Sequence, residues 1–179
     1  MLKYSIIIIL TCLLKAGYSV PASTDMISED TLHDILPLVN GKVSYIRTVD
    51  CGTVTLAELF RRARIWMLQS GPEDKILVAD KETGDLVSHK TVVITIPRSE
   101  NNAGGIYSVS YTLVIECANR KYRSSLNHME LLQNGTLIPI ESFNLKSEQE
   151  TKDFYKALDK KLAIVLSDLE QNTKNYTPF

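Results

Sequence analysis

The chain has 179 residues, a formal net charge of -1 at pH 7 and 23% charged residues, which is the balance of an ordinary soluble domain. This balance gives no support to a role that depends on bulk electrostatic attraction to nucleic acid or to a membrane surface. If the N-terminal export signal predicted below is removed, about 160 residues remain. This length is enough for one domain that buries roughly two-thirds of its unfolded surface.

The first 19 residues predict a signal peptide. Lys3 gives a positive start, and the apolar run Tyr4–Leu14 is too short to span a bilayer comfortably. Residues 17–19 (GYS) then offer a small-x-small cleavage site. Cys12 lies inside the apolar run, which disfavours lipid anchoring. We therefore expect a periplasmic or secreted protein without a transmembrane span after cleavage, with an uncleaved N-terminal anchor as the alternative.

The next segment, residues 20–42, is small, polar and acidic at its start and is predicted to be a flexible leader, with at most a short helical turn over Thr31–Leu38. Val43–Val49 is rich in β-branched and aromatic residues and predicts a strand. A helix is expected to begin at Thr55, because Thr55-Leu56-Ala57-Glu58 has the spacing of a capping box. Gly71-Pro72 ends its apolar stripe.

Four strand-like runs follow, separated by turn residues: Lys75–Asp80, Leu86–Ile96, Ile106–Cys117 and Tyr122–Leu132. Residues 136–143 are expected to be extended at a sheet edge, because they contain Pro139. A second capping box over residues 147–150 begins a helix over about residues 148–171. The order predicts a single α+β domain over residues 43–179, β-α-β(4)-α, with two helices packed on one face of an antiparallel sheet.

The stretch Leu113–Ser124 (LVIECANRKYRS) predicts a β-hairpin with residues 119–120 at its tip. Opposite residues then pair as Ala118 with Lys121, Cys117 with Tyr122, Glu116 with Arg123, Leu113 with Leu126 and Tyr111 with His128. Side chains alternate between the two faces of a strand, so Cys117 faces the core. The wetter face is a candidate interaction face that carries Thr112, Glu116, Arg123, Ser125 and Asn127.

This register excludes a catalytic dyad within the hairpin. Glu116 points away from Cys117 and cannot orient its thiol. His128 lies roughly 20 Å along the partner strand, whereas a cysteine and a histidine must approach within about 3 Å to exchange a proton.

The sequence leaves two alternatives for Cys51 and Cys117, a disulfide bond or two free thiols. An oxidising compartment would permit the bond without requiring it. If the first strand pairs with the last, the two residues lie two strand spacings apart, about 9–10 Å, whereas a disulfide needs Cα atoms about 4.4–6.8 Å apart.

No motif in the chain points to a metal, a cofactor or catalysis. The three histidines, His33, His89 and His128, do not stand at metal-ligand spacing. Gly104-Gly105 is a lone pair that does not open a helix, and no serine lies in a nucleophile-elbow pattern. We therefore expect a protein that is not an enzyme and has no cofactor.

Basic side chains recur on the first helix and around the hairpin tip: Arg61, Arg62, Arg64, Arg120, Lys121 and Arg123. We interpret them as a solvated helix face and a hairpin tip rather than as one basic patch. Trp66 continues the apolar stripe of its helix and is predicted to lie in the core.

Three stretches, LPLVNGKVSYIRTVDCGTVTLAELFRRARIWM, YSVSYTLVIEC and NRKYR, carry a resemblance to a known family. Over about residues 43–131 the chain resembles a family of bacterial envelope proteins that is described as a domain of unknown function with a TBP-like fold. The resemblance implies the β-α-β(4)-α order, with Trp66, Tyr122 and Arg123 at recurrent positions. It implies neither nucleic-acid binding nor catalytic residues, because a fold does not carry a function.

The sequence is compatible with two main functions. The first is an exported, non-enzymatic binding module of the bacterial envelope, whose uncovered sheet face contacts a partner. The second is a periplasmic small-molecule carrier with an apolar pocket between the sheet and the C-terminal helix, lined by Tyr111, Leu113, Leu126, Phe154 and Leu158. A cysteine-dependent enzyme built on Cys117 is the weakest alternative.

Overall fold

The computed structural model describes residues 32, 34–71, 75–99 and 103–176. The predicted signal peptide and most of the predicted leader lie outside these residues. The strands and helices are β1 (Leu38–Val39), β2 (Lys42–Val43), β3 (Tyr45–Asp50), α2 (Leu56–Gln69), β4 (Lys75–Asp80), β5 (Asp85–Ile96), β6 (Gly105–Ala118), β7 (Lys121–Gln133), β8 (Thr136–Pro139), the 3-10 helix η1 (Ile140–Ser142) and α3 (Glu148–Lys174).

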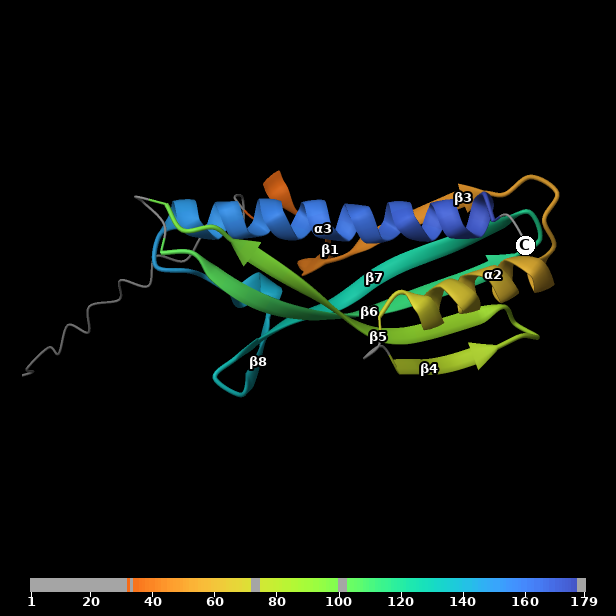
Figure 1. Ribbon diagram of the computed structural model, residues 1–179, viewed down its shortest axis with the longest axis horizontal. Coiled ribbons are helices and arrows are strands. Elements are labelled where there is room, and N and C mark those ends of the chain that lie inside the picture. The colour runs from red at the N-terminus through yellow and green to blue at the C-terminus, as the bar shows by residue number, and fades with distance from the viewer. Residues whose placement is uncertain (1–31, 33, 72–74, 100–102, 177–179) are drawn as a thin grey trace, which may run out of the picture.

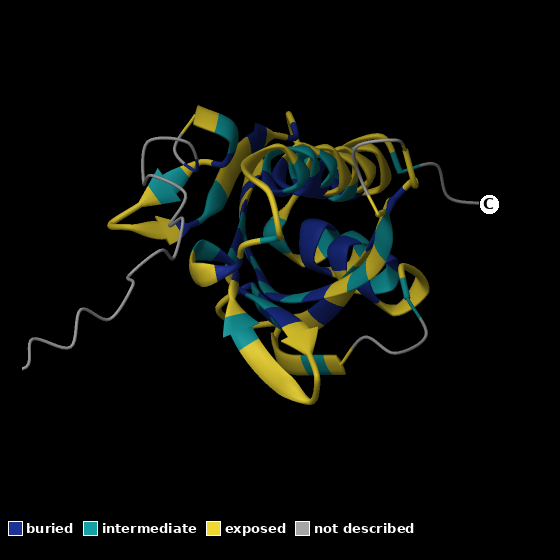
Figure 2. Cartoon of the chain, turned by 90° about the vertical axis from the view of Figure 1, so that its left-hand side faces the viewer, coloured by how far each residue is buried: buried dark blue, intermediate teal, exposed yellow. Residues whose placement is uncertain are grey.

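The main sheet is antiparallel with the strand order β3-β7-β6-β5-β4, and the short β8 also pairs with β7. Helices α2 and α3 lie on the same face of this sheet and contact each other (Figure 1). Seen from one end, the sheet curves beneath the two helices, and the buried residues lie between the two layers (Figure 2). The predicted α+β architecture is therefore confirmed. Among the described residues, no helix is both long and apolar enough to cross a membrane.

Both helices begin where the sequence predicts. The Thr55 side chain accepts a hydrogen bond from the Glu58 amide at 3.4 Å, and Ser147 accepts one from the Glu150 amide at 3.2 Å. The Glu58 carboxylate does not complete the predicted capping box: it accepts hydrogen bonds from Arg61 and Arg62 instead.

The register of the β6–β7 hairpin is confirmed from its tip as far as Leu113, which pairs with Leu126. The predicted pairing of Tyr111 with His128 is wrong, because the register shifts between Ser110 and Thr112. His128 has φ 51°, so a β-bulge at this point inserts an extra residue into β7.

The folded domain begins earlier than the predicted boundary at residue 43. Strands β1 and β2 form a hairpin around Asn40-Gly41, and both of these residues have positive φ. Leu32 and Leu36 are buried, so this part of the predicted leader belongs to the core. Asn-Gly is the preferred sequence for a two-residue hairpin turn, and this signal was readable in the sequence.

Candidate interaction surface

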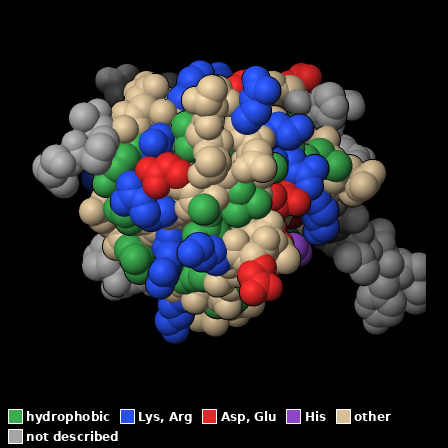
Figure 3. Space-filling view, turned by 90° about the vertical axis from the view of Figure 1, so that its right-hand side faces the viewer, with side chains coloured by type: hydrophobic (Ala, Val, Ile, Leu, Met, Phe, Trp, Pro, Cys, Tyr) green, Lys and Arg blue, Asp and Glu red, His purple; other side chains and the backbone are tan. Residues whose placement is uncertain are grey.

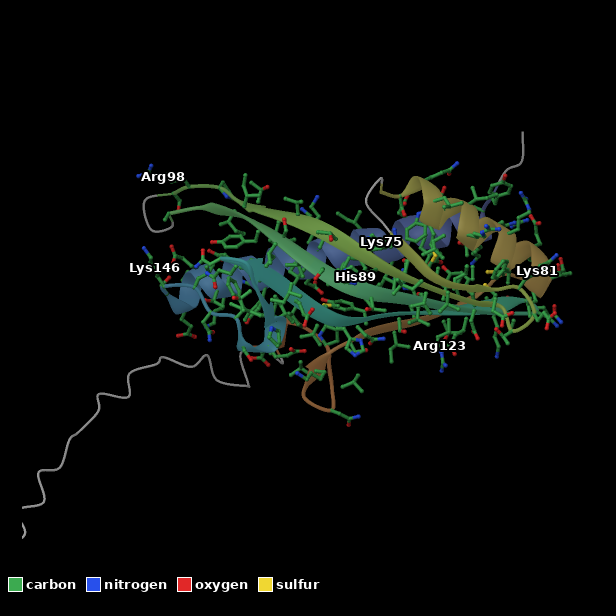
Figure 4. The ribbon with its side chains drawn as sticks, turned by 90° about the horizontal axis from the view of Figure 1, so that it is seen from below. Lys75, Lys81, His89, Arg98, Arg123 and Lys146 are labelled. Atoms are coloured by element: carbon green, nitrogen blue, oxygen red, sulfur yellow. The ribbon has the colours of Figure 1, made fainter. Side chains whose placement is uncertain are left out.

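The face of the sheet opposite α2 and α3 is called the outer face below. It carries the five residues predicted for an interaction surface: Thr112, Glu116, Arg123, Ser125 and Asn127. Each of these side chains is exposed or half-buried, whereas their neighbours in each strand are buried on the helix side, apart from the exposed His128 at the bulge. Arg123 points away from α2 (Figure 4). The structure therefore brings the predicted residues together on one surface.

An ion pair marks one end of this surface. Arg123 donates to Glu116 through Nε at 2.6 Å and through Nη2 at 2.7 Å. These hydrogen bonds hold the pKa of the Glu116 carboxyl below its usual range. Both side chains remain accessible to water, so the pair stabilises the fold by no more than about 1 kcal/mol.

A line of small and apolar side chains crosses the outer face beside this ion pair. The strand registers place one residue from each of five strands in succession: Ile46, Ser125, Val114, Val87 and Val78. We call this line the apolar row. Its two ends are the most open, because Ile46 is 59% and Val78 is 44% exposed. Four strand spacings make the row about 19 Å long.

Polar residues border the apolar row on both sides. One flanking line runs through Thr48, Arg123, Glu116 and Asp85. The other runs through Asn127, Thr112, His89 and Lys75. An apolar centre between polar margins is the usual composition of a protein–protein contact surface.

One hollow on this face is small. It has a volume of about 250 Å³ and lies around Glu116, Lys121 and Arg123. Sites for drug-sized ligands usually measure about 300–1,000 Å³. This hollow is therefore smaller than a site that encloses a drug-sized ligand.

The five residues predicted to line an apolar pocket are all buried in the hydrophobic core: Tyr111, Leu113, Leu126, Phe154 and Leu158. Phe154 packs edge to face against Phe143 at 5.0 Å and Tyr107 at 5.2 Å between ring centroids. None of the five residues lines the hollow of the outer face or two further hollows of about 330 and 630 Å³. In the described chain these side chains fill space rather than line it.

The two described cysteines are free and buried, so the disulfide left open by the sequence is not formed. Burial raises the pKa of the Cys117 thiol to about 12, and it also raises the pKa of Cys51. The thiolate is the nucleophilic form of cysteine, so both thiols are poorly reactive near neutral pH. Glu116 faces the opposite side of the sheet from Cys117, as predicted.

The sequence analysis did not predict that a lysine of β5 is buried. Lys90 is 3% exposed on the helix side of β5, and its Nζ donates to the Ser70 hydroxyl at 2.5 Å. The same ammonium lies 4.9 Å from the ring centroid of Trp66, which is buried in the core as predicted. Trp66 in turn donates from Nε1 to Asp168 on α3 at 2.6 Å. The alternation of side chains along β5 indicates this position, because Lys90 lies four residues after the buried Leu86 and faces the same side of the sheet.

These contacts join α2, α3 and β5. Within residues 32, 34–71, 75–99 and 103–176, no group of three or more His, Cys, Asp and Glu residues is arranged to hold a metal ion. The contacts around Lys90 and Trp66 link the two helices to the sheet.

Residues 45–131, from the start of β3 nearly to the end of β7, match the model of a family described as a domain of unknown function (DUF4468) with TBP-like fold. Over these residues the chain is similar to the DUF4468 family. The match includes α2 and the strands that form the apolar row, whereas α3 follows it. None of the curated proteins compared with the chain matches it.

Two solved structures share the fold of this chain. A crystal structure of a DUF4468 family protein from Bacteroides ovatus has a TM-score of 0.66 at 14% identity, covering 80% of this chain and 92% of that one. A TBP-like protein from Parabacteroides distasonis has a TM-score of 0.66 at 15% identity, covering 79% of this chain and 98% of that one. At such low identity the likeness extends to the fold alone, which is α+β and TBP-like.

Proposed function

We propose that this protein is an exported, non-enzymatic binding protein of the bacterial cell envelope, and that the outer face of its sheet contacts a protein partner. The N-terminal sequence supports export, and the organisms of the two solved relatives support a bacterial setting. The observation that carries the proposal is the apolar row. Its ends, Ile46 and Val78, are large apolar side chains that the fold leaves in water.

A contact surface explains this exposure better than folding does. The core is already formed on the other face, where the alternate residues of the same strands pack against α2 and α3. Residues of the outer face are therefore not needed to bury the helices. A continuous apolar line with polar margins marks a binding site more often than scattered exposed residues do.

The cysteines support a binding role over a catalytic one. A nucleophilic cysteine needs a lowered pKa and access to substrate, whereas Cys117 is buried with a pKa raised to about 12. The carrier with a pocket between sheet and α3 has weaker support, because its five predicted lining residues pack in the core.

The proposal can be tested with a photo-crosslinking amino acid in cells that export the protein. We would place it at Ile46 on the outer face and, as a matched control, at Ile164 on α3, which is 53% exposed. The proposal expects a discrete protein adduct from position 46, and its loss in a Val78→Lys background. Equal adducts from both positions, or none from position 46, would argue against it.

Export is tested separately in the same cells. The intact mass of the periplasmic protein should lack the first 19 residues and show no added lipid. A full-length mass in the cytoplasmic fraction would refute the envelope location and leave the contact surface to be judged on the crosslinks.

A further inference from the structure

A groove of about 630 Å³ lies on the outer side of α2, against the turn that joins β4 to β5. We call it the α2 groove. It is distinct from the outer face, because α2 lies on the opposite side of the sheet. Its volume falls within the range of sites that bind small molecules.

Three large apolar residues of α2 line the α2 groove: Phe60, Ile65 and Leu68. Phe60 is buried, Ile65 is half-buried and Leu68 is 63% exposed. A leucine so open to water, beside two further apolar side chains in a concave surface, offers a place for a hydrocarbon chain.

Three cations border this apolar lining: Arg61, Arg64 and Lys81. The groove contains one carboxylate, Glu58, which is bound at 2.8 Å by both Arg61 and Arg62. These two arginines lower the pKa of Glu58 to about 2, so its charge is permanently present and already matched. Arg61 is also occupied by the Tyr176 ring, 5.0 Å away.

Arg64 and Lys81 differ from the other cations of the groove. Within the part of the chain that the structure describes, neither makes an ion pair or a side-chain hydrogen bond. Arg64 lies one helical turn, about 6 Å, before Leu68. Unmatched positive charge and exposed hydrocarbon are therefore adjacent. Figure 3 looks onto this end of the molecule and shows Lys and Arg side chains around exposed hydrophobic ones.

We propose that the α2 groove binds a single-chain amphiphilic anion, a long-chain carboxylate, with its apolar chain over Leu68 and its head group on Arg64 and Lys81. A free inorganic anion would leave the apolar lining in water. A neutral hydrocarbon would leave the two cations without partners, and a cationic amphiphile would be repelled. Only a molecule with both properties matches both halves of the groove.

Dodecanoate below its micellar concentration is a suitable probe, with binding followed by isothermal titration calorimetry. The test variant is Arg64→Gln with Lys81→Gln. The matched control is Arg98→Gln with Lys146→Gln, which removes the same charge from exposed residues. Arg98 and Lys146 lie at the end of the molecule opposite Lys81 (Figure 4). All four positions are exposed, so we expect every variant to fold, as circular dichroism can verify.

We expect saturable binding of one dodecanoate per chain, about tenfold weaker in the test variant and unchanged in the control variant. A third variant, Leu68→Asn, should weaken binding without any change of charge. No binding of dodecanoate would overturn the proposal. Equal losses in the test and control variants, or equal binding of dodecyltrimethylammonium, would overturn it as well.

Discussion

Replacing His128 by glycine should stabilise this protein, whereas the same replacement at His89 should destabilise it. His128 sits at the β7 bulge with φ 51°, in the left-handed region, which costs an L-residue about 1–2 kcal/mol. Glycine avoids this cost but loses about 0.5–1 kcal/mol of backbone entropy on folding. The difference predicts a net gain of about 0.5–1 kcal/mol in the free energy of unfolding for His128→Gly.

His89 is a matched control because it is also an exposed histidine within a long strand of the same sheet. It pairs regularly with Thr112 and is not among the residues with positive φ. His89→Gly should therefore cost about 0.5–1 kcal/mol. Urea denaturation with an unchanged slope measures both shifts. A destabilised His128→Gly variant, or shifts of the same sign in both variants, would refute the strain that we assign to the bulge.

Three further predictions concern the cysteines, the acid limb of stability and the buried lysine. Cys51 and Cys117 should react with a thiol reagent only at the rate of unfolding, and the intact mass should show both thiols reduced; fast labelling of the native protein would contradict their burial. The pKa of Glu58 is lowered from 4.5 to about 2, so its contribution to stability is present above pH 4.5 and is lost as the pH falls towards 2. In Glu58→Gln the loss of the free energy of unfolding between pH 4.5 and pH 2 should be smaller than in the wild type. The difference should be less than about 1 kcal/mol, because the site is open to water. An unchanged pH profile would count against the pairing of Glu58 with the two arginines. Lys90→Ala should lower the free energy of unfolding by about 2 kcal/mol, because the contact with Trp66 and a partly buried hydrogen bond to Ser70 are lost. A change below about 0.5 kcal/mol in urea denaturation would show that these contacts do not stabilise the fold.

The sequence was most informative where one local rule decides the structure. Alternation of side chains predicted the register near the hairpin tip, because a slip by one residue would have turned Cys117 to water and Glu116 to the core. The side-chain caps at Thr55 and Ser147 were predicted for the same reason, since a capping hydrogen bond joins residues only three apart.

Other features depend on distant residues, and the sequence could not show them. The apolar row exists only because β3 and β6 both pair with β7, and β6 and β4 both pair with β5, which brings Ile46 and Val78 into one line. The bulge at His128 was missed because its sequence contains no glycine, and glycine is the usual mark of a residue with positive φ. The helix-side position of Lys90 follows from alternation, but its partners on α2 do not.

The likeness to the solved relatives cannot replace tests on this chain's own surfaces. Identities of 14% and 15% are compatible with the same sheet and helices, because many different apolar residues can fill one core. The residues of the outer face and of the α2 groove are outside that constraint: Ile46 and Arg64 can change without disturbing the packing of α2 and α3. Where folding does not constrain a surface, an apolar row or an unmatched cation is present either by chance or because the surface binds a partner. The crosslinking and dodecanoate experiments decide between these two explanations, each for its own surface.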